Sequence, residues 1–176
     1  MKTPALALTL ATLLATSQMA VAAAPVAAPA APGLNASHVK DTVSLLEAMQ
    51  AEKMMRSVAG YSRYGSEAQR TAVFDKLNKV PAGVIHQRLS VPVSRVLSPK
   101  TVVEMTRFYN SSFGQKVLTA TYNSKPSMFA QQAPQATKEE RKIINRPEYL
   151  AANKEFEAAE PKIRHEAFKL LQVLSK

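Results

Sequence analysis

Residues 149–174, YLAANKEFEAAEPKIRHEAFKLLQVL, contain the clearest periodicity of the chain. Apolar residues recur there in steps of three or four, which is the spacing of one face of an α-helix. They are Tyr149, Ala152, Phe156, Ala159, Ile163, Ala167, Leu170 and Leu174. Because this stripe continues through Pro161, we expect one long helix that bends at the proline, whose ring crowds the carbonyl of Glu157.

The remainder of the sequence favours helices as well. It holds only five glycines, no segment alternates apolar β-branched residues with polar ones, and apolar residues recur at three and four. We therefore predict an all-α fold, a compact bundle of five or six short to medium helices with a long Pro-kinked C-terminal helix.

Capping residues place the first helices. We expect one over 39–58, capped by Asn35 or Ser37, and a second from Ser66 to Val80, opened by the pair Ser66 and Gln69 at capping-box spacing. The first helix should bury one face, formed by Val39, Val43, Leu46 and Met49.

Proline and serine mark the middle of the chain. Residues 84–97 keep helical spacing around Pro92, which predicts a kinked helix. Ser98 followed by Pro99 predicts the start of the next helix. That helix should end at Asn110-Ser111, and Ser112 with Gln115 should open another. Gly114 would allow another backbone to approach closely.

Two further segments complete the domain. Residues 123–136 contain Pro126 and Pro134 and are typical of a surface loop. Thr137 and Glu140 have capping-box spacing, and they predict a short helix that ends before Pro147.

The N-terminus predicts export. Lys2, the apolar run 5–14 and small residues up to Ala22 have the order of a cleaved signal peptide, residues 1–22. The alternative is an uncleaved anchor, but polar residues interrupt the apolar run, and spanning needs about 20 apolar residues. An Ala/Pro-rich flexible spacer, 23–36, and a single helical domain, 37–176, should follow.

The chain is basic, and its charge favours anionic partners. Lys and Arg outnumber Asp and Glu by 23 to 13, a formal charge of +10 that becomes +9 when Lys2 is removed. For an exported protein we expect an anionic envelope component or an acidic protein. The charges are dispersed and Trp is absent, so no nucleic acid is expected. A basic surface that is simply well solvated is the alternative.

Residues 97–118, LSPKTVVEMTRFYNSSFGQKVL, resemble the family known as domain of unknown function 2059. The matching residues are Ser98, Glu104, Phe108, Tyr109, Ser111, Gly114, Gln115 and Lys116. A looser likeness covers about residues 54–125. The resemblance implies a small, exported, all-helical protein of Gram-negative-type bacteria, without an established activity, cofactor or catalytic residue.

The sequence offers little for catalysis. His38, His86 and His165 are isolated and cysteine is absent, so we expect no catalytic residue, no cofactor and no metal site. The pairs Glu139-Glu140 and Glu155-Glu157 fall on predicted polar faces and should be solvated. Met49, Met54 and Met55 have a soft-metal alternative, but core packing explains them better.

Four residues around the predicted break form a candidate lip for a ligand or partner: Tyr109, Asn110, Gln115 and Lys116. The start of the helix at Ser112 has free backbone donors that would receive an anion beside Lys116. In the alternative, Phe108 and Tyr109 only fill the core and seal a helix junction.

These observations predict an uncharacterised, exported, non-enzymatic binding or accessory protein of the bacterial envelope, periplasmic or secreted, with a basic surface. The alternative is a structural or stress-related interaction module that uses its C-terminal helix. A periplasmic hydrolase is the third hypothesis, and the lack of a recognisable nucleophile argues against it.

Overall fold

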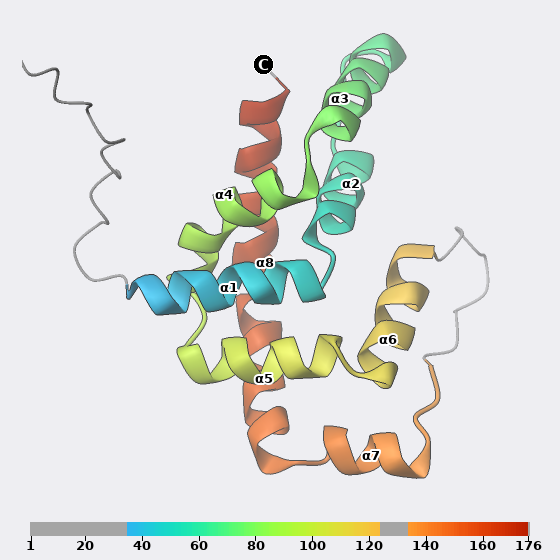
Figure 1. Ribbon diagram of the computed structural model, residues 1–176. Coiled ribbons are helices and arrows are strands. Elements are labelled where there is room, and N and C mark those ends of the chain that lie inside the picture. Colours follow the sequence, from blue (N-terminus) through green and yellow to red (C-terminus); the bar gives the residue numbers. More distant parts are fainter. Residues whose placement is uncertain (1–34, 124–133, 176) are drawn as a thin grey trace, which may run out of the picture.

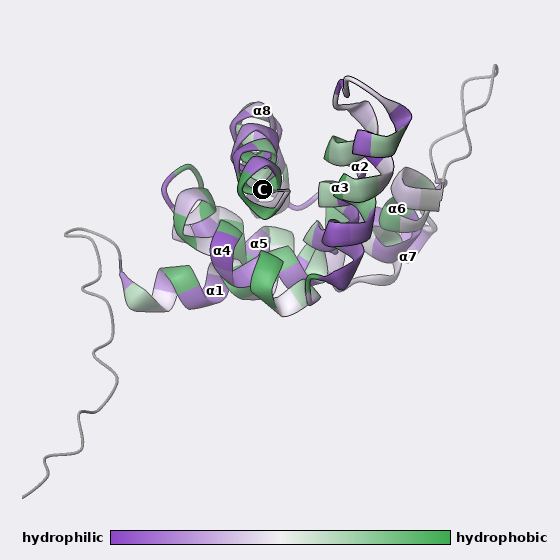
Figure 2. Ribbon diagram, turned by 90° about the horizontal axis from the view of Figure 1, so that it is seen from above, coloured by the Kyte–Doolittle hydropathy of each residue, from purple (hydrophilic) through white to green (hydrophobic). Residues whose placement is uncertain are grey.

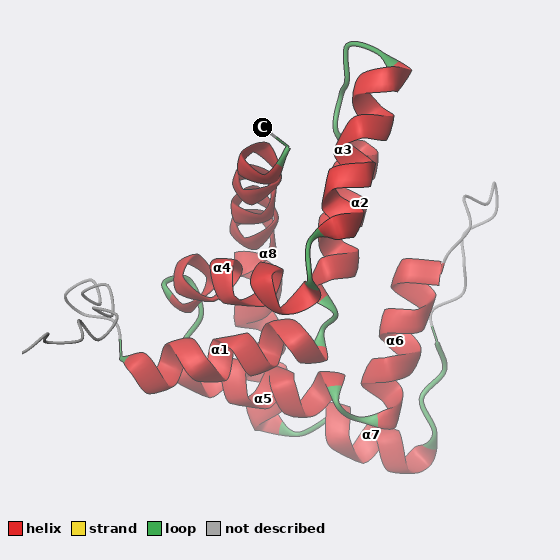
Figure 3. Ribbon diagram, turned by 45° about the horizontal axis from the view of Figure 1, so that its top comes forward, coloured by secondary structure: helices red, strands yellow, loops and turns green. Residues whose placement is uncertain are grey.

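The computed structural model describes residues 35–123 and 134–175. Within them the chain forms helices and no strand (Figure 3), which confirms the all-α class. The predicted signal peptide, most of the spacer and residues 124–133 of the predicted loop lie outside the described residues.

Eight helices occupy the described residues, more than the five or six expected. In chain order they are α1 (Ala36–Ala48), α2 (Ala51–Tyr61), α3 (Glu67–Lys79), α4 (Ala82–Ser94), α5 (Pro99–Tyr109), α6 (Ser112–Asn123), α7 (Lys138–Ile144) and α8 (Pro147–Leu174). Among them, no helix has both the length and the apolarity needed to cross a membrane.

Helix α8 is the long C-terminal helix predicted from residues 149–174. Pro147 occupies its first turn, and the helix continues through Pro161 to Leu174. Its buried residues are Tyr149, Ala152, Phe156, Ala159, Ile163, Ala167 and Leu171. The stripe matches the prediction except near its end, where Leu171 is buried and Leu170 only half-buried.

Helix α8 runs behind α4, α1 and α5 in Figure 1. Helices α4 and α5 pack against it, α1 packs on both of these, and α2 packs on α8 as well. Seen along α8 in Figure 2, α4 and α5 lie on one side of it, and α2 and α3 on another. The core between them includes Met55, Leu89, Met105 and Ile163, all almost fully buried.

The single helix predicted over 39–58 is wrong, because the chain turns at Gln50. This residue has the left-handed backbone angles φ 56° and ψ 54° and separates α1 from α2. The turn lets Leu46 before it and Met55 after it both reach the core. Met49 and Met54 are buried too, in agreement with a packing role for the methionines.

The buried face of α1 is rotated from the predicted one. Val39 and Val43 are half-buried, whereas His38 and Thr42 lie in the interior. The His38 Nε2 donates to the carbonyls of Ser94 and Leu97, at 2.9 and 3.0 Å. Two carbonyl acceptors fix the proton on Nε2, so this imidazole joins α1 to the end of α4.

The capping predictions are mostly confirmed. Ser66 accepts from the Gln69 amide, Ser98 from the Thr101 amide, and Thr137 forms a full capping box with Glu140. At the start of α6 the cap is Ser111 instead of Ser112, since its Oγ accepts from the Gly114 amide at 3.1 Å.

Gly114 fixes the angle between α5 and α6. A Cβ atom at this position would lie 2.0 Å from the carbonyl oxygen of Phe108. Only glycine permits this approach, which confirms the prediction for Gly114. The close turn places the aromatic residues of α5 beside those of α6.

Candidate functional site

A hollow of about 390 Å³ opens between α2, α5, α6 and α8, and we call it the aromatic groove. Small-molecule sites typically measure ~300–1,000 Å³. The residues lining it are Met49, Met54, Ser57, Phe108, Tyr109, Phe113, Val117, Leu118, Thr121, Tyr122, Tyr149, Asn153, Phe156, Glu157, Glu160, Ile163 and Arg164.

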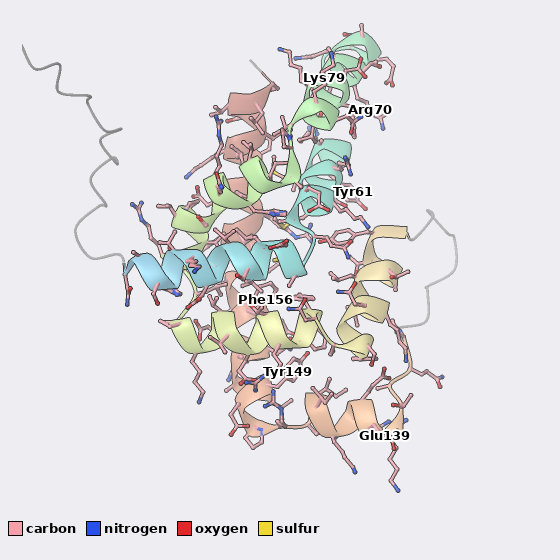
Figure 4. The ribbon with its side chains drawn as sticks, viewed as in Figure 1. Tyr61, Arg70, Lys79, Glu139, Tyr149 and Phe156 are labelled. Atoms are coloured by element: carbon pink, nitrogen blue, oxygen red, sulfur yellow. The ribbon has the colours of Figure 1, made fainter. Side chains whose placement is uncertain are left out.

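Aromatic rings contact one another along one wall of this groove. The ring centre of Phe108 lies 4.9 Å from that of Tyr149 and 5.1 Å from that of Tyr109. Tyr109 in turn lies 6.0 Å from Phe156. These spacings are those of favourable aromatic pairs, so the wall is a preformed apolar surface. Tyr149 and Phe156, both labelled in Figure 4, are seven residues apart on α8, about two helical turns.

Three tyrosines give the groove a few polar atoms. Burial, and then the neighbouring phenol of Tyr122, raise the pKa of Tyr109 well above its usual value. Burial, and then Glu52, raise the pKa of Tyr122 to about 12. The Tyr122 hydroxyl donates to the Met49 carbonyl at 3.0 Å. The phenols therefore stay protonated at neutral pH. Because the Tyr122 and Tyr149 protons are already donated to Met49 and Asn153, Tyr109 is the phenol that can donate to a ligand.

The predicted lip is divided between three places. Tyr109 lines the aromatic groove, whereas Asn110 and Gln115 border a separate shallow hollow of about 290 Å³ beside α1. The Gln115 amide donates to the Tyr109 carbonyl and accepts from Gln50 at 3.4 Å. Lys116 lines neither hollow. The binding role of these four residues stays a prediction.

Lys116 belongs to a group that we call the Glu140 cluster, formed by Ser112, Lys116, Thr137 and Glu140. The Glu140 carboxylate accepts from the Thr137 amide at 2.9 Å, the Ser112 hydroxyl at 2.7 Å and the Lys116 ammonium at 2.9 Å. These bonds, in that order, lower the pKa of Glu140 to about 2. The anion beside Lys116 at the start of α6 is thus a carboxylate of the protein itself.

Glu140 and Glu155 are not the solvated carboxylates that the sequence predicted. Glu140 is only 6% exposed, while Glu139 lies in solvent. The Glu155 carboxylate accepts from Ser98 and from the Thr101 hydroxyl at the start of α5. Burial would raise the pKa of Glu155, but these hydrogen bonds outweigh it and lower the pKa. Both residues fix helix starts.

The three histidines do not come together. His38 lies between α1 and α4, His86 contacts Glu52 across α2 and α4 at 3.1 Å, and His165 is exposed on α8. Neither His86 nor Glu52 lines the aromatic groove. In the described residues, no three His, Asp or Glu side chains are close enough to hold a metal ion.

Basic side chains lie beside the aromatic groove. Lys53 and Arg56 border a hollow of about 340 Å³ that shares Ser57 and Tyr122 with the groove. Another hollow, of about 500 Å³, shares Arg164 with the groove and is lined by Val58, Tyr61, Ser62, Arg63 and Phe168 as well. We call this second hollow the Arg63 hollow.

Sequence reasoning missed most of this site. Phe156 and Arg164 come from α8, which is far from the predicted lip along the chain, whereas Tyr122 lies on α6, the same helix as Gln115 and Lys116. Phe156 was assigned correctly to the buried stripe of α8, but only packing shows that part of this stripe faces a hollow. One sign was present in the sequence, because large aromatic residues gather in 108–122 and again in 149–156.

Comparison with known proteins gives no relative: no protein-family model matches the chain, and no similar curated protein or solved structure is found. The resemblance of residues 97–118 to the domain of unknown function 2059 family stays a prediction.

Proposed function

We propose that this protein is a non-enzymatic binding or accessory protein of the bacterial envelope, periplasmic or secreted, and that it binds its ligand in the aromatic groove. The observation that carries the proposal is the groove itself. It combines a wall of contacting rings with polar side chains, so it can offer a ligand both apolar contacts and hydrogen bonds. The polar side chains are those of Ser57, Thr121, Asn153, Glu157, Glu160 and Arg164. Four helices, α2, α5, α6 and α8, contribute to it.

The surroundings of the groove favour binding over catalysis. Its carboxylates already have partners, since Glu160 pairs with Arg164 at 2.7 Å and Glu157 accepts from Asn153 at 2.7 Å. A hydrolase needs a nucleophile and a base held together in a cleft. The His86–Glu52 pair would be the natural base, but neither residue lines the groove.

The test is whether a ligand from the envelope stays in the groove. Protein purified from its native compartment, without detergent, is analysed intact by native mass spectrometry, and the released small molecules are identified. The half-buried Ser57 lines the mouth, so Ser57→Phe should fill it. Ser44→Phe, at an exposed position on α1, is the control.

We expect a bound small molecule in the wild type and in Ser44→Phe, and its loss from Ser57→Phe with an unchanged helical circular dichroism spectrum. Equal occupancy in all three proteins, or no bound molecule in any of them, would contradict the proposal.

A second function is favoured by exposed apolar residues on α8. Leu150 and Phe168 are 54% and 38% exposed, and their separation corresponds to about five helical turns, which puts them on one side of the helix. An interaction module that docks through α8 would use them. Its binding should resist added salt, because apolar contacts are not screened.

A further inference from the structure

We propose that the ligand is an amphiphile with an anionic headgroup, whose apolar tail lies in the aromatic groove and whose headgroup lies in the Arg63 hollow. This inference rests on the proposed function and adds the class of ligand. It follows from three properties of the two hollows: their continuity, their contrast in lining and the distribution of charge.

The two hollows adjoin. Arg164 lines both of them, and α2 and α8 form the walls of each, with Met54 and Ile163 in the aromatic groove and Val58 and Phe168 in the Arg63 hollow. Figure 4 places Tyr61, at the far end, well above Tyr149 and Phe156. A ligand that follows α8 would therefore occupy both hollows.

The lining changes along this path. The lower part contains the wall of contacting rings, which suits an alkyl or acyl tail, with Asn153 and Glu157 hydrogen-bonded to each other beside it. At the upper end Tyr61 is 87% exposed, and the Arg63 and Arg164 side chains accompany it. An apolar groove that ends in guanidinium groups matches a molecule with a tail and a charged head.

Charge at the upper end is positive. Among the described residues, Arg63 and Arg164 are the only charged ones that line the Arg63 hollow, and none of its lining residues there is a carboxylate. Within the described residues the Arg63 side chain has no hydrogen bond and no ion pair, so its donors are available. Lys53 and Arg56 add two positive charges on α2, but they lie beside the aromatic groove and not at this end.

Two acidic residues line the aromatic groove. Glu160 pairs with Arg164 at 2.7 Å, so the charges of these two side chains offset each other and Arg63 supplies the net positive charge of the hollow. Glu157 is seven residues before Arg164 on α8, about 10 Å along the helix axis. A cationic headgroup would instead have to bind near Glu157 and the neighbouring rings. The unpaired guanidinium of Arg63 makes the anionic head the better match.

The test uses amphiphiles with the same tail and different heads. Dodecyl phosphate, dodecyltrimethylammonium and dodecyl maltoside are titrated into the wild-type protein by calorimetry, each below the concentration at which it self-assembles. We expect all three to bind, with dodecyl phosphate at least about tenfold tighter than the cation. Added salt should weaken the binding of dodecyl phosphate and leave the affinity for dodecyl maltoside unchanged.

Two further arms separate head from tail. Inorganic phosphate should bind at least a hundredfold more weakly than dodecyl phosphate. Decyl phosphate should bind up to about fifteenfold more weakly, since two methylene groups are lost at ~0.8 kcal/mol each.

Variants locate the head. Arg63→Gln should weaken dodecyl phosphate about fivefold to tenfold without affecting the maltoside. Arg88 is an exposed arginine on α4 outside both hollows. Arg88→Gln should change the affinity for dodecyl phosphate or dodecyl maltoside by no more than about twofold.

A reporter locates the tail. The chain has no Trp, so Thr121→Trp and Thr119→Trp each introduce a single indole on α6. Thr121 lines the aromatic groove and Thr119 does not. Ligand should shift the emission of the first variant to shorter wavelength and leave the second unchanged.

The outcomes distinguish the two proposals. If dodecyltrimethylammonium binds as tightly as dodecyl phosphate, or if Arg63→Gln has no effect, the anionic headgroup is wrong and a binding groove remains. If inorganic phosphate binds as well as dodecyl phosphate, the amphiphile is wrong. If none of the three amphiphiles binds the folded protein, both proposals fail.

Discussion

The two sides of α6 differ in a way that separates structural from functional residues. On one side, Lys116 and Ser112 bind the Glu140 carboxylate, and the polar groups of the cluster satisfy one another. On the other side, Phe113 and Tyr122 line a hollow that no side chain of the described residues fills. The polar side is therefore closed, and the apolar side is open.

This difference teaches that conspicuous polar residues are not by themselves a site. The first turn of a helix is its positive end and favours a negative charge. At the start of α6 the protein supplies that charge itself, from Glu140 on α7. On the apolar side the rings of Phe113 and Tyr122 are instead only half-buried where they border the hollow, so a ligand can cover apolar surface there.

Gly114→Ala should have the largest effect, because both sides of α6 depend on the turn at this glycine. The new Cβ would meet the Phe108 carbonyl at 2.0 Å, and relieving this clash should cost ~3 kcal/mol or more of the free energy of unfolding. Urea denaturation measures it. Gly60→Ala, at a helical position with open space, is the control and should be neutral or stabilising.

Gly114→Ala with wild-type stability would mean that α5 and α6 do not approach each other as described. Both the aromatic groove and the Glu140 cluster would then need revision.

Glu140→Gln should open the closed side of α6. The carboxylate has its pKa lowered from 4.5 to about 2, so it stabilises the fold above pH 4.5 and this contribution disappears as the pH falls towards 2. The variant should be less stable at pH 7 and should lose less stability on acidification. Thermal unfolding from pH 7 to pH 2 measures both.

Glu139→Gln is the matched control, because Glu139 is the exposed neighbour of Glu140. An identical acid dependence in wild type and Glu140→Gln would show that the cluster does not hold α6 to α7.

Tyr122→Phe should have a smaller effect on the open side. It removes the hydrogen bond from the hydroxyl to the Met49 carbonyl, which should cost about 1 kcal/mol. The ring remains, so the apolar wall is preserved. Urea denaturation measures the change, and a loss above about 3 kcal/mol would indicate that the hydroxyl has a larger structural role.

Gln50→Gly should have the smallest effect on the free energy of unfolding, and it should stabilise the protein instead of destabilising it. Gln50 is in the left-handed region, which costs a side-chain-bearing residue ~1–2 kcal/mol, whereas glycine enters it freely at some entropic cost. We expect a gain of at most about 1 kcal/mol in thermal unfolding, and none for Gln50→Ala. Destabilisation by glycine would argue against the turn.

Much of the fold was predictable because its causes are local. The stripe of α8 is a periodicity of apolar residues, and the caps at Ser66, Ser98 and Thr137 need only residues three positions away. The break at Gln50 was not predictable in this way. Nothing at that position favours a turn, and the chain turns there because Leu46 and Met55 are both buried in the core.

The candidate site was predicted only in part, for the same reason. Tyr109 does line the aromatic groove, and it was proposed from its place beside a helix break. Arg164 and Phe156 come from α8, and Glu140 from α7, so their relation to α6 is tertiary. The pairing of Lys116 with Glu140 spans 24 residues, and no local pattern connects the two.

The most direct test of the central claim, that the apolar side of α6 binds the ligand, is photo-crosslinking in the native envelope. A benzophenone amino acid replaces Thr121, which lines the groove, or Thr119 on the closed side. We predict a covalent adduct with a small envelope molecule at 121 and none at 119. An adduct at 119 alone, or equal yields at both positions, would contradict the claim.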